Sequence, residues 1–322
     1  MKNVTIQKDN ESVEEWIHQT LKKIHRKMVE SFNINFTYFR DIKIIKQSDI
    51  LKQLTQRMRN NLKENGIVYS DNQWKQICEI LSKNQVTGFF ENFAFYNPKD
   101  EVLYMNEKMI RNHPQKIISV CAHELSEKLL STYLSSSLET PIQALVKMYT
   151  ETKKTNNTKK LYEFMDTYTG IVFKSVFKEG CCEAMALQTL RSMGYEIEVA
   201  SLEKELQIGH SKCINLLFDV DNARRSQEGI RKVRMHPDYE RRIAPVGEEK
   251  LIKEVLKWSQ IIKGVSYYLG YPLARAVLEK YGVKGVKLAL EKHPPLKAQY
   301  FANPQAYLTL LEKLTRVIEQ RR

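Results

Sequence analysis

Apolar residues recur at helical spacing over most of this chain, and this periodicity limits the fold more than any other feature of the sequence. In residues 11–30 the apolar positions that share one face of a helix are Val13, Trp16, Ile17, Leu21, Ile24 and Met28. The same reasoning predicts further helices over 48–64, 72–83, 160–193, 202–228, 248–262, 267–281, 283–291 and 304–319. We therefore expect a predominantly α-helical protein.

Two stretches are typical of β-strands. Residues 34–45, INFTYFRDIKII, are rich in β-branched and aromatic side chains, which favour a strand. In residues 88–107, two strand-like runs flank the turn-forming sequence Asn97-Pro98-Lys99-Asp100, so we predict a β-hairpin. A helix is expected to begin near Pro114, because the N–H that proline lacks would have no helical acceptor there. The predicted fold class is α+β, predominantly α-helical, with a small sheet or hairpin before that helix.

Composition limits the size and the location of the protein. With 322 residues, 42% of them hydrophobic, the chain can bury a sizeable core, and we expect an N-terminal region, 1–87, packed on a larger domain, 88–322. The first residues are polar, and no stretch approaches the ~20 apolar residues that span a bilayer. The five cysteines form no CxxC pair, which agrees with a reducing compartment. We therefore predict a cytoplasmic protein without membrane insertion.

The formal net charge of +13 allows two interpretations. Excess positive charge can attract nucleic acid, but it also keeps a protein soluble. Basic residues crowd the segment 222–242, yet Glu228, Asp238 and Glu240 interrupt them. A solvated helix or loop explains such a segment more often than a phosphate-binding surface does. Solubility is our first interpretation, and association with nucleic acid is kept as an alternative.

The helix expected after Pro114 carries HELSE, in which His123 and Glu127 stand four residues apart. They project from one helical face and can reach a single ion. In the related H-E-x-x-H signature both terminal positions are histidines, and the glutamate after the first, here Glu124, is the general base. A carboxylate at position 127 can still bind zinc at ~2.0–2.2 Å. Its charge reduces the Lewis acidity of the ion and favours harder metals. Zinc is the expected metal, with manganese or another divalent ion as the alternative, although this pentapeptide also occurs by chance on solvated helices.

A second segment, VFKEGCCEAMALQTL, carries Glu179 and, one helical turn later, Glu183. The residues around them are largely apolar, which indicates a buried helix. Unpaired carboxylates are costly in such a place, so these two acids are expected to have partners. The alternative is an acidic pair on a solvated face.

The order of several segments resembles the zincin-like, gluzincin-type metallopeptidases of archaea and bacteria. The matching segments, over roughly residues 88–308, are FAFYNPKDEVLYM, VCAHELSEKLL, FKEGCCEAMA, YYLGYPLARAVLEKYGVKGVKLAL and HPPLKAQYFANPQAYL. The resemblance implies a zincin-like metallopeptidase fold, with Glu179 as the third metal ligand beside His123 and Glu127. It also implies that Glu183 holds the outer ring nitrogen of His123, as in gluzincins such as thermolysin.

The chain departs from this family pattern at two places. Glu127 stands where the family has a histidine ligand, and Leu296-Lys297-Ala298 stands where the family usually has Ser-Thr-Glu. A peptidase also needs a donor for the developing oxyanion, typically a tyrosine or a histidine. Tyr268 and His293 are our candidates for that role, and the neighbouring tyrosines Tyr267 and Tyr271 are also plausible, although core packing explains any one of them.

Three functional hypotheses follow. The first is a metal-dependent peptidase acting on a peptide or protein substrate, in which Glu124 takes a proton from the attacking water. The second is a catalytically impaired pseudo-peptidase that keeps the fold as a binding or scaffold module. The third is a basic protein that associates with nucleic acid through residues 222–242.

Overall fold

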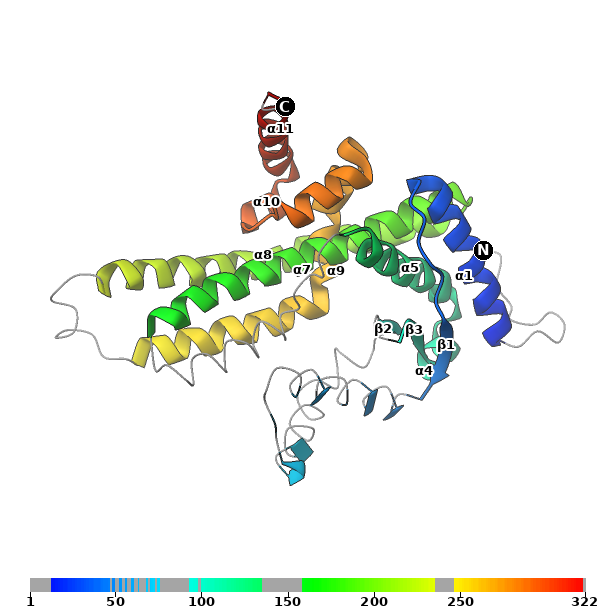
Figure 1. The fold of residues 1–322 in the computed structure, drawn as a ribbon, viewed down its shortest axis with the longest axis horizontal. Coiled ribbons are helices and arrows are strands. Elements are labelled where there is room, and N and C mark those ends of the chain that lie inside the picture. The colour runs from blue at the N-terminus through cyan, green and yellow to red at the C-terminus, as the bar shows by residue number, and fades with distance from the viewer. Residues whose placement is uncertain are drawn as a thin grey trace. The chain divides into compact units, whose positions relative to one another are not determined.

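The computed structural model describes residues 13–46, isolated residues between 48 and 75, and residues 93–97, 100–134, 158–234 and 246–320. The chain forms two compact units. The first unit contains residues 1–135 and 182–201, and the second contains 136–181 and 202–322. The predicted boundary near residue 87 stays a prediction. The described residues are mostly helical, with one small sheet (Figure 1), which confirms the predominantly helical α+β class.

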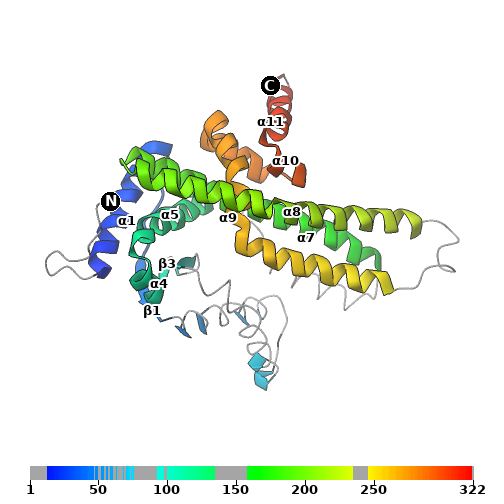
Figure 2. The same cartoon turned by 180° about the vertical axis from the view of Figure 1, so that it is seen from behind.

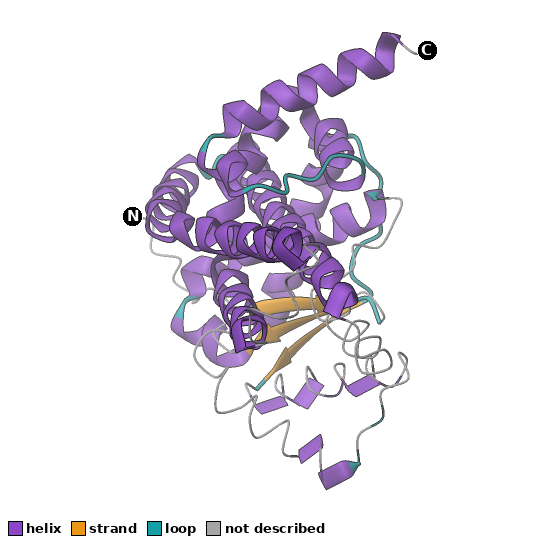
Figure 3. Cartoon of the chain, turned by 90° about the vertical axis from the view of Figure 1, so that its left-hand side faces the viewer, coloured by secondary structure: helices purple, strands orange, loops and turns teal. Residues whose placement is uncertain are grey.

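The sheet of the first unit has three strands in the order β1-β3-β2 (Figure 3). β1 (Asp41–Ile45) runs parallel to β3 (Val102–Asn106), and β2 (Ala94–Asn97) runs antiparallel to it. All residues of the central strand β3 are buried. The predicted hairpin is thus confirmed as β2 and β3, and a strand forms in the second half of the predicted stretch 34–45.

The turn before β3 is held by the side chain of Asp100. One carboxylate oxygen accepts a hydrogen bond from the backbone N–H of Val102 at 3.2 Å, and the other accepts one from the Tyr104 hydroxyl at 3.0 Å. The next residue, Glu101, has a φ of +58°. This left-handed conformation is unfavourable for a residue with a Cβ. The contacts of this turn therefore hold the backbone of Glu101 in a conformation of higher energy.

In the described part of the first unit, one helix precedes the strands of this sheet along the chain and two follow them. They are α1 (Val13–Phe32), α4 (Glu107–Asn112) and α5 (Ile117–Tyr133). α1 packs on α5, and α5 packs on β2. The buried residues of α1 are Ile17, Leu21, Ile24 and Met28, as the spacing predicted. Pro114 begins a short 3-10 turn rather than the helix itself, which starts at Ile117.

Long helices dominate the rest of the chain (Figure 1, and from behind in Figure 2). They are α7 (Thr158–Ser192), α8 (Glu196–Arg234) and α9 (Val246–Glu291), followed by α10 (Ala298–Ala302) and α11 (Pro304–Gln320). The prediction that one helix ends at residue 262 and the next begins at residue 267 was wrong, because α9 continues through these residues. The break predicted between 281 and 283 is confirmed by Gly282, whose φ of +62° is non-helical. α4 and α10 were not predicted.

Several sequence predictions concern residues outside this description. The helices expected over 48–64 and 72–83 lie largely outside the described residues. Within the basic segment, α8 continues to Arg234, and residues 235–245 lie outside them. Among the described helices, none combines the length and the apolar character needed to cross a membrane.

Two glycines of the second unit allow the backbones of α7 and α9 to touch. A Cβ at Gly180 would lie 2.1 Å from the carbonyl carbon of Gly270, and a Cβ at Gly270 would lie 2.0 Å from the carbonyl oxygen of Val176. Ordinary contacts of a Cβ begin at 3.4 Å. Since no side chain fits there, glycine at both positions is a condition for this crossing.

Candidate functional site

His123 and Glu183, which come from helices distant in the sequence, lie in contact in the first unit. The Nδ1 atom of His123 in α5 is 2.9 Å from Oε1 of Glu183 in α7, and the two side chains are 18% and 21% exposed. The two atoms are close enough for electrostatic attraction, but the ring Nδ1 is not aligned with the carboxylate as a hydrogen bond. A carboxylate beside Nδ1 still favours a proton on that nitrogen, which leaves the lone pair on Nε2. The structure thus brings together the histidine and the carboxylate that the sequence singled out as partners.

Two more residues of the HELSE motif lie on the same helix. Glu124 is 6% exposed. Burial is the main cause that raises the pKa of the neighbouring Cys121 thiol, and the charge of Glu124 is the second. Glu127 is partly exposed, one helical turn after His123. The buried Glu124 and the ring of His123 therefore occupy adjacent positions of α5, as a general base and a ligand would need to.

Tyr96 in β2 is a neighbour of this helix that the sequence analysis missed. Burial raises the pKa of its hydroxyl to about 12, and the nearby charges of Glu101 and Glu127 contribute to the increase. Its position on the face of β2 that packs on α5 could have been inferred from alternation along the hairpin, because successive strand residues point to opposite faces.

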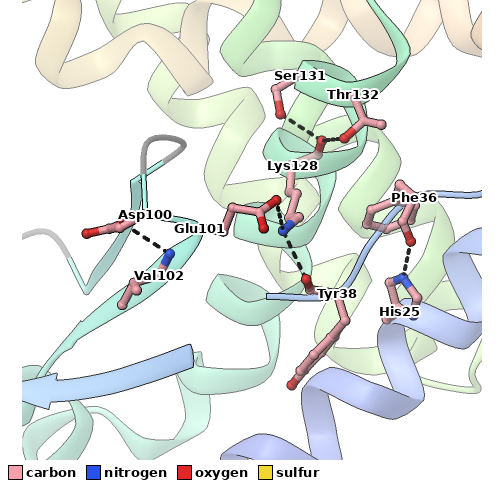
Figure 4. Close-up of polar contacts among 9 residues, drawn as sticks. All are labelled: His25, Phe36, Tyr38, Asp100, Glu101, Val102, Lys128, Ser131 and Thr132. Carbon is pink, nitrogen blue, oxygen red and sulfur yellow. Dashed lines mark hydrogen bonds and ion pairs between the residues drawn. The ribbon is translucent and has the colours of Figure 1, made fainter. Parts of the chain in front are cut away.

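Lys128, the residue after the motif, was also missed. Its side chain is only 1% exposed, and its ammonium donates a hydrogen bond to the carbonyl oxygen of Tyr38 at 2.9 Å (Figure 4). It also forms an ion pair with Glu101 Oε1 at 3.3 Å. The rings of Phe39 and Tyr96 lie 5.5 Å and 5.3 Å from Nζ, within the range of cation–π attraction. Lysine is rarely buried, so sequence alone favoured an exposed position.

The proposed third ligand, Glu179, belongs to the second unit. It is partly exposed and lies one turn before Glu183 in the continuous helix α7. Its charge adds to burial in raising the pKa of the Cys181 thiol. Buried thiols whose pKa is raised are poor sources of the thiolate that binds metals, so Cys121 and Cys181 are weaker ligand candidates than the carboxylates.

The candidate oxyanion donors Tyr268 and His293 both take part in contacts within the second unit. The Tyr268 hydroxyl donates a hydrogen bond to Glu205 Oε1 in α8 at 3.0 Å, and burial is the main cause that raises its pKa. The carbonyl oxygen of His293 accepts a hydrogen bond from the buried hydroxyl of Tyr307. The Tyr268 contact joins α9 to α8, as the packing role considered for it requires, whereas the His293 contact involves only the backbone of that residue.

Tyr271, another candidate, belongs to a similar network between α8 and α9. Its hydroxyl donates to Glu203 Oε1 at 2.7 Å, and the Arg275 guanidinium donates to the same oxygen at 3.0 Å. Burial, followed by this hydrogen bond, raises the pKa of Tyr271 well above its usual range. A hydroxyl engaged in this way holds two helices together.

No group of three or more His, Cys, Asp or Glu side chains that could hold a metal ion is found in the part of the chain that the structure describes. Comparisons with protein-family models, with curated proteins and with solved structures found no match. The zincin-like fold and the metal remain predictions from the sequence.

Proposed function

We propose that this chain is a zincin-like, metal-dependent peptidase whose site is built around His123 in α5. The observation that carries the proposal is the 2.9 Å contact between His123 Nδ1 and Glu183 Oε1. Histidines that bind metals commonly donate their other ring N–H to a carboxylate, which fixes the ring and its tautomer. The family resemblance of the sequence independently indicates the same two residues as a ligand and its orienting partner.

The proposed roles follow from the chemistry of each side chain. His123 presents the lone pair of Nε2, Glu127 adds a carboxylate one helical turn later, and Glu179 is the third ligand that the sequence predicts. Glu124, a largely buried carboxylate, would accept the proton of the attacking water. When bound, a divalent cation would supply Lewis acidity at the scissile carbonyl and at that water. His123 and Glu183 fit the roles of a metal ligand and its orienting partner. A complete set of three ligands is not found among the described side chains.

The second candidate function is a catalytically impaired pseudo-peptidase. A pseudo-peptidase would keep α5, the sheet and the His123–Glu183 contact as a scaffold while holding metal weakly or not at all. The glutamate at position 127 favours this alternative, because its charge makes a bound cation a poorer Lewis acid.

Metal analysis of the purified full-length protein distinguishes the two candidates. A metal-dependent enzyme should hold about one equivalent of zinc or manganese, and His123→Ala and Glu179→Ala should lose it. Glu183→Gln should weaken binding by about 10–100-fold, as is typical when the partner of a ligand histidine is changed. Glu14→Ala, an exposed position on α1, is the matched control and should retain the metal. A native protein without metal after incubation with zinc and with manganese would contradict the peptidase proposal.

Restoring the family motif tests competence for catalysis. Glu127→His should increase zinc affinity and peptide hydrolysis, and the double variant with Glu124→Gln should lose the hydrolysis while keeping the zinc. Binding without any hydrolysis in Glu127→His would favour the scaffold.

A further inference from the structure

Lys128 occupies a site that is built for a buried ammonium. Its side chain is 1% exposed, and its ammonium contacts a backbone carbonyl from the segment before β1 and a carboxylate from the turn before β3 (Figure 4). Two aromatic rings, those of Phe39 and Tyr96, also lie near the ammonium. These partners come from two parts of the chain, the segment before β1 and the hairpin of β2 and β3, and both are distant in sequence from Lys128. A single side chain of α5 therefore joins the helix to both edges of the sheet region.

A charge in this position needs an explanation beyond stability. The Lys128 ammonium is buried, whereas its ion-pair partner Glu101 is 48% exposed. Burying a charge costs desolvation that its contacts often fail to offset, and an apolar side chain of the same length often serves such an interface equally well. What the ammonium adds is direction, because its hydrogen bond to Tyr38 and its ion pair with Glu101 are satisfied in only one rotation of α5. Fixing a single arrangement is the best supported use of buried charges.

This rotation determines where the residues of the candidate site point. Lys128 lies one helical turn after Glu124 on the same side of α5 and directly after Glu127. Tyr96, whose ring lies 5.3 Å from the Lys128 ammonium, is also close enough to Glu127 for that charge to help raise its pKa. The Lys128 contacts therefore reach the site through the helix itself.

We infer that Lys128 is a positioning residue: by holding α5 against Tyr38 and Glu101 in one rotation, it sets the positions of His123, Glu124 and Glu127 for binding a metal ion. This inference rests on the proposed function. It assigns to Lys128 no contact with a substrate or a metal.

The test measures zinc affinity of the full-length protein by competition with a chromophoric chelator, at a temperature where every variant is folded. Lys128→Met keeps the length of the side chain and removes the charge, and it should weaken zinc binding by about tenfold or more. In the metal-free protein, the backbone amides of α5 should also exchange hydrogen faster. Glu101→Gln, which leaves the Tyr38 hydrogen bond, should change both quantities in the same direction by less, and it serves as the test if Lys128→Met does not fold.

Ile42→Ala is the matched control for a general loss of stability. Ile42 is buried in β1 at 2% exposure, so this change weakens the same unit without removing the ammonium, and zinc affinity should stay at the wild-type value. Equal losses of affinity in Ile42→Ala and Lys128→Met, or wild-type affinity in Lys128→Met, would overturn the inference and leave the proposed site intact. A wild-type protein that binds no zinc would overturn the proposed function itself, and the inference with it.

Discussion

The crossing of α7 and α9 provides a quantitative test of the structure, because two glycines of one helix should respond in opposite ways to the same substitution. In Gly270→Ala the new Cβ would lie 2.0 Å from the carbonyl oxygen of Val176, where an ordinary contact needs 3.4 Å. The obstructing atom is backbone, so the helices themselves must separate. Gly264, earlier in α9, is exposed, and a Cβ added there would have nothing within 4 Å.

Two opposing contributions to the free energy of unfolding decide the outcome, a gain in helix propensity and a cost of steric overlap. Replacing glycine by alanine in a helix stabilises it by about 1 kcal/mol, whereas forcing an extra methyl group into a packed interface costs about 1–3 kcal/mol and occasionally more. Because backbone cannot rotate away as a side chain does, we expect the upper end of that range, and a net loss of about 2 kcal/mol for Gly270→Ala. Gly264→Ala should gain up to about 1 kcal/mol.

Thermal unfolding followed by circular dichroism measures both variants. For a unit of this size each kcal/mol shifts the midpoint by about 2–4 °C, so Gly270→Ala should unfold about 4–8 °C below the wild type. Gly264→Ala should unfold at or above the wild-type temperature. If Gly270→Ala unfolds at the same temperature as Gly264→Ala, the backbone contact between α7 and α9 is not present and the reasoning is refuted.

Two further predictions concern the second unit. Burial lowers the pKa of His210, whose Nε2 lies 3.2 Å from the carbonyl oxygen of Phe301. The unfolded chain therefore binds the His210 proton more tightly than the folded chain does. The free energy of unfolding should be steady above the unfolded pKa of 6.5 and fall as the pH drops below it. His210→Gln should reduce that fall in urea titrations between pH 7 and pH 5, and parallel curves for the two proteins would contradict the assignment. Gly282→Ala should cost about 1–3 kcal/mol, because φ +62° and ψ −163° lie in a region open essentially to glycine. There is room for the methyl group, so an unchanged midpoint would mean that the backbone is not in this conformation.

Local patterns were sufficient for several elements. The spacing of apolar residues predicted α1 and its buried face, and the turn-forming residues between two strand-like runs predicted the hairpin of β2 and β3. The same holds for the break at Gly282 between Tyr281 and Val283. Each of these signals depends on residues close together in the chain, where the periods of helix and strand are directly visible.

The candidate site was predictable only in part. His123 and Glu183 were paired from the sequence because a known arrangement of two helices suggested it, and the structure places them in contact. The identical reasoning overlooked Tyr96 and Lys128, because nothing local indicates that a lysine after HELSE is buried beside two aromatic rings. Their positions depend on how α5 packs on β2.

What the sequence by itself determined is the set of elements: the helical faces, the hairpin, the glycine that interrupts α9, and the residue types capable of binding a metal. What only the tertiary structure decided is which of several similar residues is exposed and which is in close contact with a distant segment. Gly264 and Gly270 have the same local signal, and one lies open while the other touches a backbone. The physical reason is that helix and strand formation is governed by neighbouring residues, whereas close contacts and buried charges are set by whichever distant segment packs against them.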